Sequence, residues 1–241
     1  MNAKHHYDKH LGNFYSWMVG NFEEKQMEQE LFFRHYKILP RVDGSALDLG
    51  SGHGLQSVSL AKLGFSVKAI DFNLQLLREL REKSSGLSIE TIESDILSFL
   101  ERSTKQVELI VCMGDTLTHF ESMAQVEILI ERVAKFLIPK GKIIISFRDL
   151  TLALTDVQRF IPVRSDENRI LTCFLEYHPS YVLVHDILQE KENGVWKQKV
   201  SAYPKLRMNE KIVTDIFHRN NISPVYSQVI NRMIYLIGEK N

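Results

Sequence analysis

The amino-acid sequence predicts an α/β protein with a central parallel sheet and an antiparallel insertion late in the chain. Between residues 46 and 149, short apolar runs alternate with segments of helical period, which is typical of βαβ units. These runs lack strict alternation of apolar and polar residues, as expected for strands buried on both faces. After residue 149, long extended stretches are separated by turn signals such as Asn193-Gly194, which indicates antiparallel strands.

The first part of the chain should hold five parallel strands with helices between them. The strands are expected at 46–50, 67–71, 87–94, 109–114 and 142–147. Helices are expected at 55–63 and 74–83, and a third should begin at Ser122, where Gln125 completes a capping box, and reach Leu137 before the stop signal at residues 139–141. Because crossovers between parallel strands are right-handed, the carboxyl ends of the strands should line one crevice, where any ligand is expected.

The rest of the chain divides into a lid and a return to the core. Extended segments are expected at 170–177, 181–190 and 195–206, followed by a helix capped by Asn209 and two final strands at 225–230 and 233–238. The predicted organisation is an N-terminal helical cap at 1–42, a core at 43–150, an antiparallel β lid at 151–208, and a helix and strands at 209–241 that complete the core.

Composition argues against several function classes. The formal net charge of the 241 residues is zero, so no overall positive field would attract nucleic acid or an anionic membrane. The two cysteines, Cys112 and Cys173, lie in apolar stretches and do not suggest a disulfide framework. The start of the chain lacks the apolar region of a signal peptide, and no apolar run approaches membrane length. We therefore expect a cytoplasmic monomer or homodimer that acts on a small molecule.

The segment ALDLGSGHG at residues 46–54 runs from a buried strand through a glycine-rich turn into a helix. Glycines at 50, 52 and 54 would let the backbone approach a ligand near the free N–H groups of the helix start. The spacing is G-x-G-x-G, whereas a dinucleotide fingerprint requires G-x-G-x-x-G. Asp48 would repel a pyrophosphate but suits a positively charged amino group. The alternative is that the glycines only form a loop.

Two further carboxylates end strands of the predicted sheet. Asp71 follows Gly50 by 21 residues, where a carboxylate can accept hydrogen bonds from ribose hydroxyls; alternatively it caps the following helix beside Asn73. Asp95 ends the third strand and can either accept from an adenine amino group or cap the helix from Ile96. Both positions are consistent with a nucleoside ligand.

The motifs ALDLGSGHG, AIDFN, ESDIL and CMGDTLTHF resemble those of class I S-adenosylmethionine-dependent methyltransferases over residues 46–149. The resemblance implies a Rossmann-like, doubly wound seven-stranded sheet whose last strand is antiparallel, with S-adenosylmethionine as cofactor and S-adenosylhomocysteine as product. It also implies that Asp48 and Gly50 lie near the methionine part, Asp71 at the ribose and Asp95 with Ile96 around the adenine. The full set of expected cofactor-binding residues is Tyr15, Trp17, Asp48, Gly50, Ser51, Gly52, Gly54, Asp71, Phe72, Asp95, Ile96, Met113, Gly114 and Asp115.

The amino-terminal YDKHLGNFYSWMVG, together with GDTLTHF and FRDL, is similar to small-molecule N-methyltransferases of the glycine and sarcosine type. This narrower resemblance implies an amine acceptor and an antiparallel lid over it. It also favours an N-terminal segment, residues 7–17, that folds over the cofactor; the alternative is that its aromatic rings pack as ordinary core.

Methyl transfer from a sulfonium needs mainly alignment and exclusion of water, so few catalytic groups are expected. His119 is the candidate for accepting a proton from an amine acceptor. The alternative is that it flanks a helix and forms hydrogen bonds with the backbone. Arg148 could bind a substrate carboxylate or pair with Asp149 or another acid. On the lid, Tyr203 and Arg207 are weaker candidates for substrate binding. The cluster of His5, His6, Asp8 and His10 could suggest a metal, but its spacing on a helix does not gather three ligands, so no metal is predicted.

Two other functions stay open from the sequence. Methylation of RNA or protein would call for a basic surface or stacking aromatics, and the N-P-P-Y type motif of many base-amino methyltransferases is replaced by CMGD. A cofactor-binding protein without transferase activity is the second, because a fold does not by itself imply a reaction.

Overall fold

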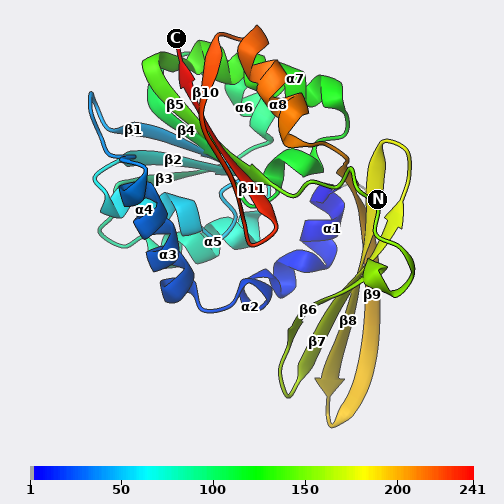
Figure 1. Ribbon diagram of the computed structural model, residues 1–241. Helices are drawn as coiled ribbons and strands as arrows, with labels where there is room; N and C mark the ends of the chain where they lie inside the picture. Colours follow the sequence, from blue (N-terminus) through cyan, green and yellow to red (C-terminus); the bar gives the residue numbers. More distant parts are fainter. Residues whose placement is uncertain (1–2) are drawn as a thin grey trace.

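The computed structural model describes residues 3–241, and its centre is a seven-stranded sheet in the order β10-β11-β5-β4-β1-β2-β3 (Figure 1). Strand β11 runs antiparallel to both of its neighbours. The predicted fold class, a mostly parallel sheet with a final antiparallel strand, is confirmed. The strands are β1 (Ser45–Leu49), β2 (Ser66–Asp71), β3 (Ile89–Glu93), β4 (Val107–Cys112), β5 (Leu137–Phe147), β10 (Ile222–Ile230) and β11 (Met233–Lys240).

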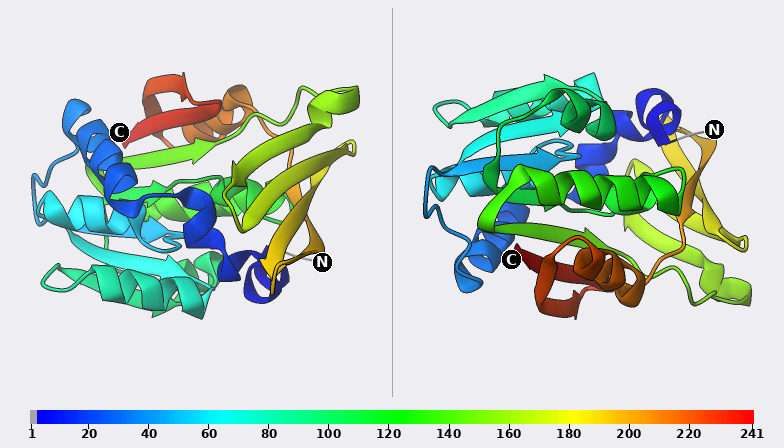
Figure 2. Two further views of the ribbon diagram at one scale, coloured as in Figure 1. Left: turned by 90° about the horizontal axis from the view of Figure 1, so that it is seen from below. Right: turned by 90° about the horizontal axis from the view of Figure 1, so that it is seen from above.

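Helices cover both faces of this sheet (Figure 2). One face buries apolar residues of α3 (Phe22–His35), α4 (Leu55–Lys62) and α5 (Leu74–Lys83). The other face buries apolar residues of α6 (Ile96–Arg102), α7 (Met123–Phe136) and α8 (Glu210–Arg219). No helix within residues 3–241 combines the length and apolar character needed to cross a bilayer.

Local sequence signals set the starts of several helices. Ser122 Oγ accepts from the backbone N–H of Gln125, and Gln125 Oε1 accepts in return from the N–H of Glu121. Asn209 caps α8 in the same way by accepting from the N–H of Ile212. The predicted helix reaching Leu137 agrees with α7, which ends at Phe136, but β5 begins earlier than the predicted residue 142, because the buried Leu137 already pairs with Val107 of β4.

The lid is a separate antiparallel sheet of four strands, β6 (Phe160–Ser165), β7 (Arg169–Tyr177), β8 (Tyr181–Glu192) and β9 (Val195–Leu206). Strand β6 was not expected from the sequence. It lies at an edge of the sheet, carries Pro162 and is mostly exposed, so it lacks an apolar pattern. An edge strand tolerates proline because one side of its backbone needs no ladder partner.

The N-terminal elements lie between the core and the lid in both views (Figures 1 and 2). They are α1 (Ala3–Lys9), the 3-10 turn η1 (Leu11–Asn13) and α2 (Tyr15–Val19), which lead into α3 on the core. On the lid side, Leu11 and Phe14 pack against Leu171 and Leu188. On the core side, α3 packs on α4. The segment therefore joins the two sheets through apolar contacts.

Candidate functional site

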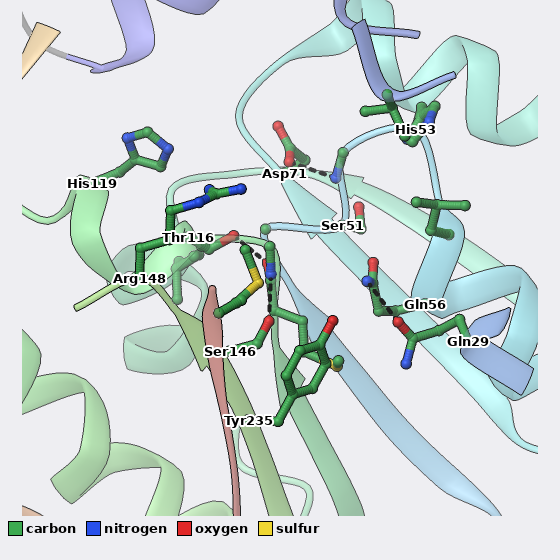
Figure 3. Close-up of a pocket in the computed structure, with 18 of the residues that line it drawn as sticks. Gln29, Ser51, His53, Gln56, Asp71, Thr116, His119, Ser146, Arg148 and Tyr235 are labelled. Carbon is green, nitrogen blue, oxygen red and sulfur yellow. Dashed lines mark hydrogen bonds between the residues drawn. The ribbon is translucent and has the colours of Figure 1, made fainter. Parts of the chain in front are cut away.

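A cavity of about 1370 Å³ opens at the carboxyl ends of the parallel strands. Residues at or just after the ends of five strands line it, namely Gly50, Asp71, Asp95, Met113 and Arg148. Figure 3 shows Ser51 and Asp71 at the glycine turn, with His119 and Arg148 to one side and Gln29 and Gln56 to the other. The strand ends thus meet at one cavity, as the parallel topology predicts.

The glycines of the turn serve two different purposes. Gly50 lines the cavity with φ +80°, and a Cβ there would collide with the side chain of Thr116. Gly54 does not line the cavity, and a Cβ there would collide with Leu80 of α5. The prediction that Gly54 clears space for a ligand is therefore not supported. Its lack of a side chain instead lets α5 pack against the start of α4.

Several polar atoms at the cavity are buried without a partner. Among the described residues, the buried side-chain atoms with no hydrogen bond include Ser51 Oγ, His53 Nε2, Gln29 Nε2 and His119 Nδ1, and all four residues line the cavity. Buried polar groups are nearly always paired in folded proteins, because leaving one unpaired costs free energy. Their concentration at one cavity indicates that it is built for a polar ligand.

Asp71 lies at the cavity surface beneath the glycine turn. Its Oδ2 accepts from the N–H of Gly52 and its Oδ1 from the N–H of Asn73, both at 2.8 Å. Asn73 rather than Asp71 caps α5, by accepting from the N–H of Leu76. Burial raises the pKa of Asp71 to about 6. Each carboxylate oxygen keeps a second lone pair, so Asp71 can still accept from ligand hydroxyls.

Asp48 lies behind the turn and does not line the cavity. Ser57 Oγ of α4 donates to its carboxylate at 2.6 Å, and burial raises the pKa of Asp48 to about 7. The predicted direct contact with an amino group is thus not available at the cavity surface. Asp48 instead fixes the start of α4 to β1.

Asp95 and Ile96 line the cavity at the end of β3. Asp95 Oδ1 accepts from the N–H of Ser98 at 2.9 Å, so the carboxylate caps α6. Capping uses one oxygen and leaves the other open to a ligand. The two interpretations of Asp95 are therefore compatible.

The N-terminal segment divides between the cavity and the lid. Tyr7 and Tyr15 line the cavity, and the Tyr15 ring lies edge-on to His53 with centroids 5.1 Å apart. Phe72, also predicted, lines the cavity beside Tyr7 at 5.7 Å. Trp17 does not line it, because its Nε1 donates to Asp166 of the lid. A cofactor contact by Trp17 is not supported by this position.

At the other end of the cavity, Met113 and Gly114 line the surface and Asp115 lies behind them. Both the backbone N–H and the guanidinium of Arg148 donate to Asp115, and Lys205 Nζ lies 2.9 Å from its Oδ2. Burial would raise the pKa of Asp115, but Lys205 and Arg148 outweigh it and hold that pKa well below its usual range. Two cations thus share one carboxylate, which leaves one excess positive charge.

His119, in the 3-10 turn η2 (Thr116–His119), lines the cavity between two tyrosines. Its ring centroid lies 5.6 Å from Tyr7 and 5.5 Å from Tyr203. Burial, and secondarily the charge of Lys205, lowers the pKa of His119 to about 3. The imidazole is therefore neutral at physiological pH, with Nδ1 free to act as an acceptor or donor according to its tautomer.

The two lid residues predicted to bind substrate do not line the cavity. Tyr203 is buried and stacks on His6 with ring centroids 4.0 Å apart. Arg207 donates to three backbone carbonyls, those of Leu150, Thr151 and His178. The guanidinium thus fixes the base of the lid, and its donors are not directed at the cavity.

Several cavity residues escaped the sequence analysis. They are Gln29 of α3, Gln56 of α4, Ser146 of β5 and Tyr235 of β11. Ser146 carried a signal, because it is a polar residue inside the apolar run of a central strand; its Oγ accepts from the N–H of Gly114 at 2.8 Å. Gln29 carried none, since a glutamine on a polar helix face is ordinary.

Comparison with known proteins relates the core to one family. Residues 46–141 match a family model described as a methyltransferase domain. A ubiquinone biosynthesis O-methyltransferase from Cupriavidus pinatubonensis is 28% identical over 102 residues, 42% of this chain. The match spans only 39% of that relative's length.

Solved structures extend the likeness to nearly the whole chain. An S-adenosylmethionine-dependent methyltransferase from Clostridium acetobutylicum has a TM-score of 0.75 at 16% identity, covering 98% of this chain and 97% of its own. An amino pentose methyltransferase from Micromonospora echinaspora, solved with S-adenosylmethionine bound, has a TM-score of 0.73 at 12% identity, covering 93% and 94%. At these identities the likeness is one of fold.

Proposed function

We propose that this chain, whose residues 46–141 match a family model for a methyltransferase domain, transfers the methyl group of S-adenosylmethionine to a small amine. The observation that carries the proposal is the convergence of the glycine turn, Asp71 and the unpartnered Ser51 Oγ and His53 Nε2 on one cavity. These groups fit a ligand with ribose hydroxyls and a polar amino-acid end. The amino pentose methyltransferase with a similar fold supports a small-molecule acceptor that carries an amino group.

In this proposal the cofactor lies along the strand ends. Asp71 accepts from the ribose hydroxyls, Asp95 with Ile96 borders the adenine, and the turn from Gly50 to Gly52 holds the methionine part. Asp48 and Asp115 act from behind the surface, by fixing the elements that carry the turn and Gly114. When bound, S-adenosylmethionine supplies a methyl group that is already activated on a positively charged sulfur.

Arg148 is the proposed site for an anionic group of the acceptor. It lines the cavity and its side chain is 49% exposed, so donors that do not reach Asp115 face the open space. The excess positive charge shared with Lys205 and Asp115 favours a carboxylate or phosphate there. The same charge disfavours a protonated amine, which suits an acceptor that must react through a free lone pair.

His119 is proposed to orient the acceptor rather than to store its proton. An alkylammonium has a pKa near that of lysine, about 10.4, so transfer to an imidazole whose pKa is about 3 is uphill by roughly 10 kcal/mol. The amine must therefore reach the site unprotonated. A neutral amine that donates an N–H to Nδ1 of His119 keeps its lone pair free to attack the methyl group.

The proposal is tested by incubating the protein with S-adenosylmethionine and separate panels of amines, amino acids and RNA, while S-adenosylhomocysteine release is measured. Turnover with an amine or amino acid supports it. Turnover with RNA alone would make the proposed acceptor class wrong. Cofactor binding without turnover on any of the three panels would favour a non-catalytic binding protein.

A further inference from the structure

We propose that the methyl acceptor carries an apolar tail, and that the tail lies in a groove between α3 and the β10–β11 hairpin. The inference rests on the proposed function for the position of the reacting group, near His119 and Arg148. The groove itself is a continuous part of the same cavity, because residues of α3 and of the hairpin line it together with the glycine turn.

The groove has one wall on α3 and one on the hairpin. Phe32 and Tyr36 lie four residues apart and both line the cavity at the carboxyl end of α3, whereas Gln29, with its unpartnered amide, lies beside Gln56 of α4. On the hairpin, Met233 and Tyr235 line the opposite side. Figure 3 shows Tyr235 pointing from β11 toward Gln29.

Aromatic rings form the far part of the groove. The Phe32 centroid lies 5.1 Å from that of Tyr235 and 4.8 Å from that of Tyr36. Tyr36 lines this part of the cavity, and its ring lies 4.1 Å from that of Tyr226, with the two hydroxyls joined by a 2.6 Å hydrogen bond. The lining residues of α3 run from Lys25 to the cap residue Tyr36, which at about 1.5 Å per residue corresponds to a length of roughly 16 Å.

The charges at the groove cancel locally. Lys25 lies 2.8 Å from Glu28, and Arg34 lies 2.8 Å from Glu30 on the same helix. The charges of these four side chains sum to zero. Arg148, Lys205 and Asp115 together carry one excess positive charge. The cavity therefore fits a ligand with an anionic head and an uncharged tail.

The volume of the cavity and the exposure of Leu31 also favour an apolar tail. The cavity volume of about 1370 Å³ exceeds the roughly 300–1,000 Å³ typical of pockets for one drug-sized ligand, so a cofactor and a minimal amine would leave the groove open. Leu31 lines the cavity and is 62% exposed. An apolar tail would cover the Leu31 side chain. Binding would be favoured because the apolar surfaces of the tail and of Leu31 are both removed from water.

The experiment uses linear carboxylates as probes on protein mixed with S-adenosylhomocysteine. Butanoate, octanoate and dodecanoate compete with 1-anilinonaphthalene-8-sulfonate, whose fluorescence reports its binding. Each added methylene that enters the groove should tighten binding up to about fourfold, since burying a methylene gains about 0.8 kcal/mol. Dodecanoate should therefore bind at least about 100-fold more tightly than butanoate.

Two variants of α3 locate the tail. Leu31→Glu places a charge in the groove and should weaken dodecanoate binding about tenfold while butanoate is unaffected. Met27→Glu is the matched control, because Met27 is one helical turn away, equally exposed at 62% and not part of the cavity lining. Arg148→Gln should weaken both acids by the same factor, because it removes a contact to the shared head.

Equal affinity for butanoate and dodecanoate, or equal effects of Leu31→Glu and Met27→Glu, would overturn the proposal. Calorimetry with S-adenosylhomocysteine alone is run on each variant. If no variant and no wild-type protein binds S-adenosylhomocysteine, the result counts against the proposed function. The affinities of butanoate, octanoate and dodecanoate measured without cofactor would still decide whether the groove takes an apolar tail.

Discussion

Lys205 of lid strand β9 and Asp115 at the end of core strand β4 form a buried ion pair, with Nζ 2.9 Å from Oδ2. Their side chains are only 12% and 3% exposed. Asp115 also holds the backbone N–H of Arg148, so the same carboxylate joins lid, core and a cavity residue. The four-stranded sheet is thus coupled through Asp115 to the proposed acceptor end of the cavity.

Replacement of Lys205 by Met should lower the free energy of unfolding by about 2 kcal/mol, because the buried carboxylate loses one charged partner and keeps only Arg148. Lys199→Met is the control, since Lys199 lies on the same strand as Lys205 and pairs with Glu190 of β8, but is 51% exposed. That surface pair should contribute less than about 1 kcal/mol. Urea unfolding of the two variants measures the difference, and equal losses would show that the pair does not hold the lid.

Arg148→Lys should raise the KM of an anionic acceptor about tenfold and leave cofactor affinity unchanged, because lysine keeps the charge but loses the planar fork. Arg219→Lys is a suitable control, since Arg219 is an exposed arginine of α8 paired with Glu127. Steady-state kinetics with the identified acceptor tests the assignment. An unchanged KM in Arg148→Lys would remove Arg148 from acceptor binding.

Affinity for S-adenosylhomocysteine should rise as pH increases through about 6, the pKa to which burial raises Asp71. Hydroxyl donors favour the ionised carboxylate, so binding should lower this pKa and release protons near pH 5 to 6. Calorimetry in buffers of different ionisation enthalpy measures that release. Asp71→Asn should abolish it, and a wild-type affinity independent of pH would contradict the role of Asp71.

The same shift sets the sign of Asp71's effect on stability without ligand. Its folded-state pKa lies above the ordinary value, so the folded protein binds the proton more tightly than the unfolded chain. The contribution of Asp71 to stability is therefore fully present below about pH 4 and is lost as pH rises through about 6.

Features that depend on neighbours in sequence could be predicted well. The capping roles of Ser122 and Asn209 follow from residues three positions apart, and the parallel strands follow from their apolar runs. The place of Asp71 at the cavity also followed, because the carboxyl ends of parallel strands meet at one edge.

Features set by distant packing could not be predicted. Gly54 was interpreted as clearing space for a ligand, but the side chain that requires glycine there is Leu80 of another helix. Trp17 was placed at the cofactor because nothing local reveals that Asp166 of the lid accepts its N–H. Strand β6 was missed because Pro162 and its exposure remove the usual strand pattern.

Hydrogen exchange at residues 7–20 should slow when S-adenosylhomocysteine is added. Tyr7 and Tyr15 line the cavity, so ligand contacts would oppose local opening of the short elements that carry them. Mass spectrometry of this segment measures the change, with the α8 peptide at 210–219 as an internal control remote from the cavity lining. Equal protection with and without ligand would assign these rings to packing between core and lid.

The most direct test of the account is calorimetric titration of S-adenosylhomocysteine into the wild-type protein and Asp71→Ala. We predict binding of one molecule per chain, weakened in the variant by about 1–3 kcal/mol because ribose hydroxyls and two backbone N–H groups lose their acceptor. Wild-type protein that shows neither heat of binding nor a shift in Tm at millimolar ligand would contradict the assignment of this cavity to S-adenosylmethionine.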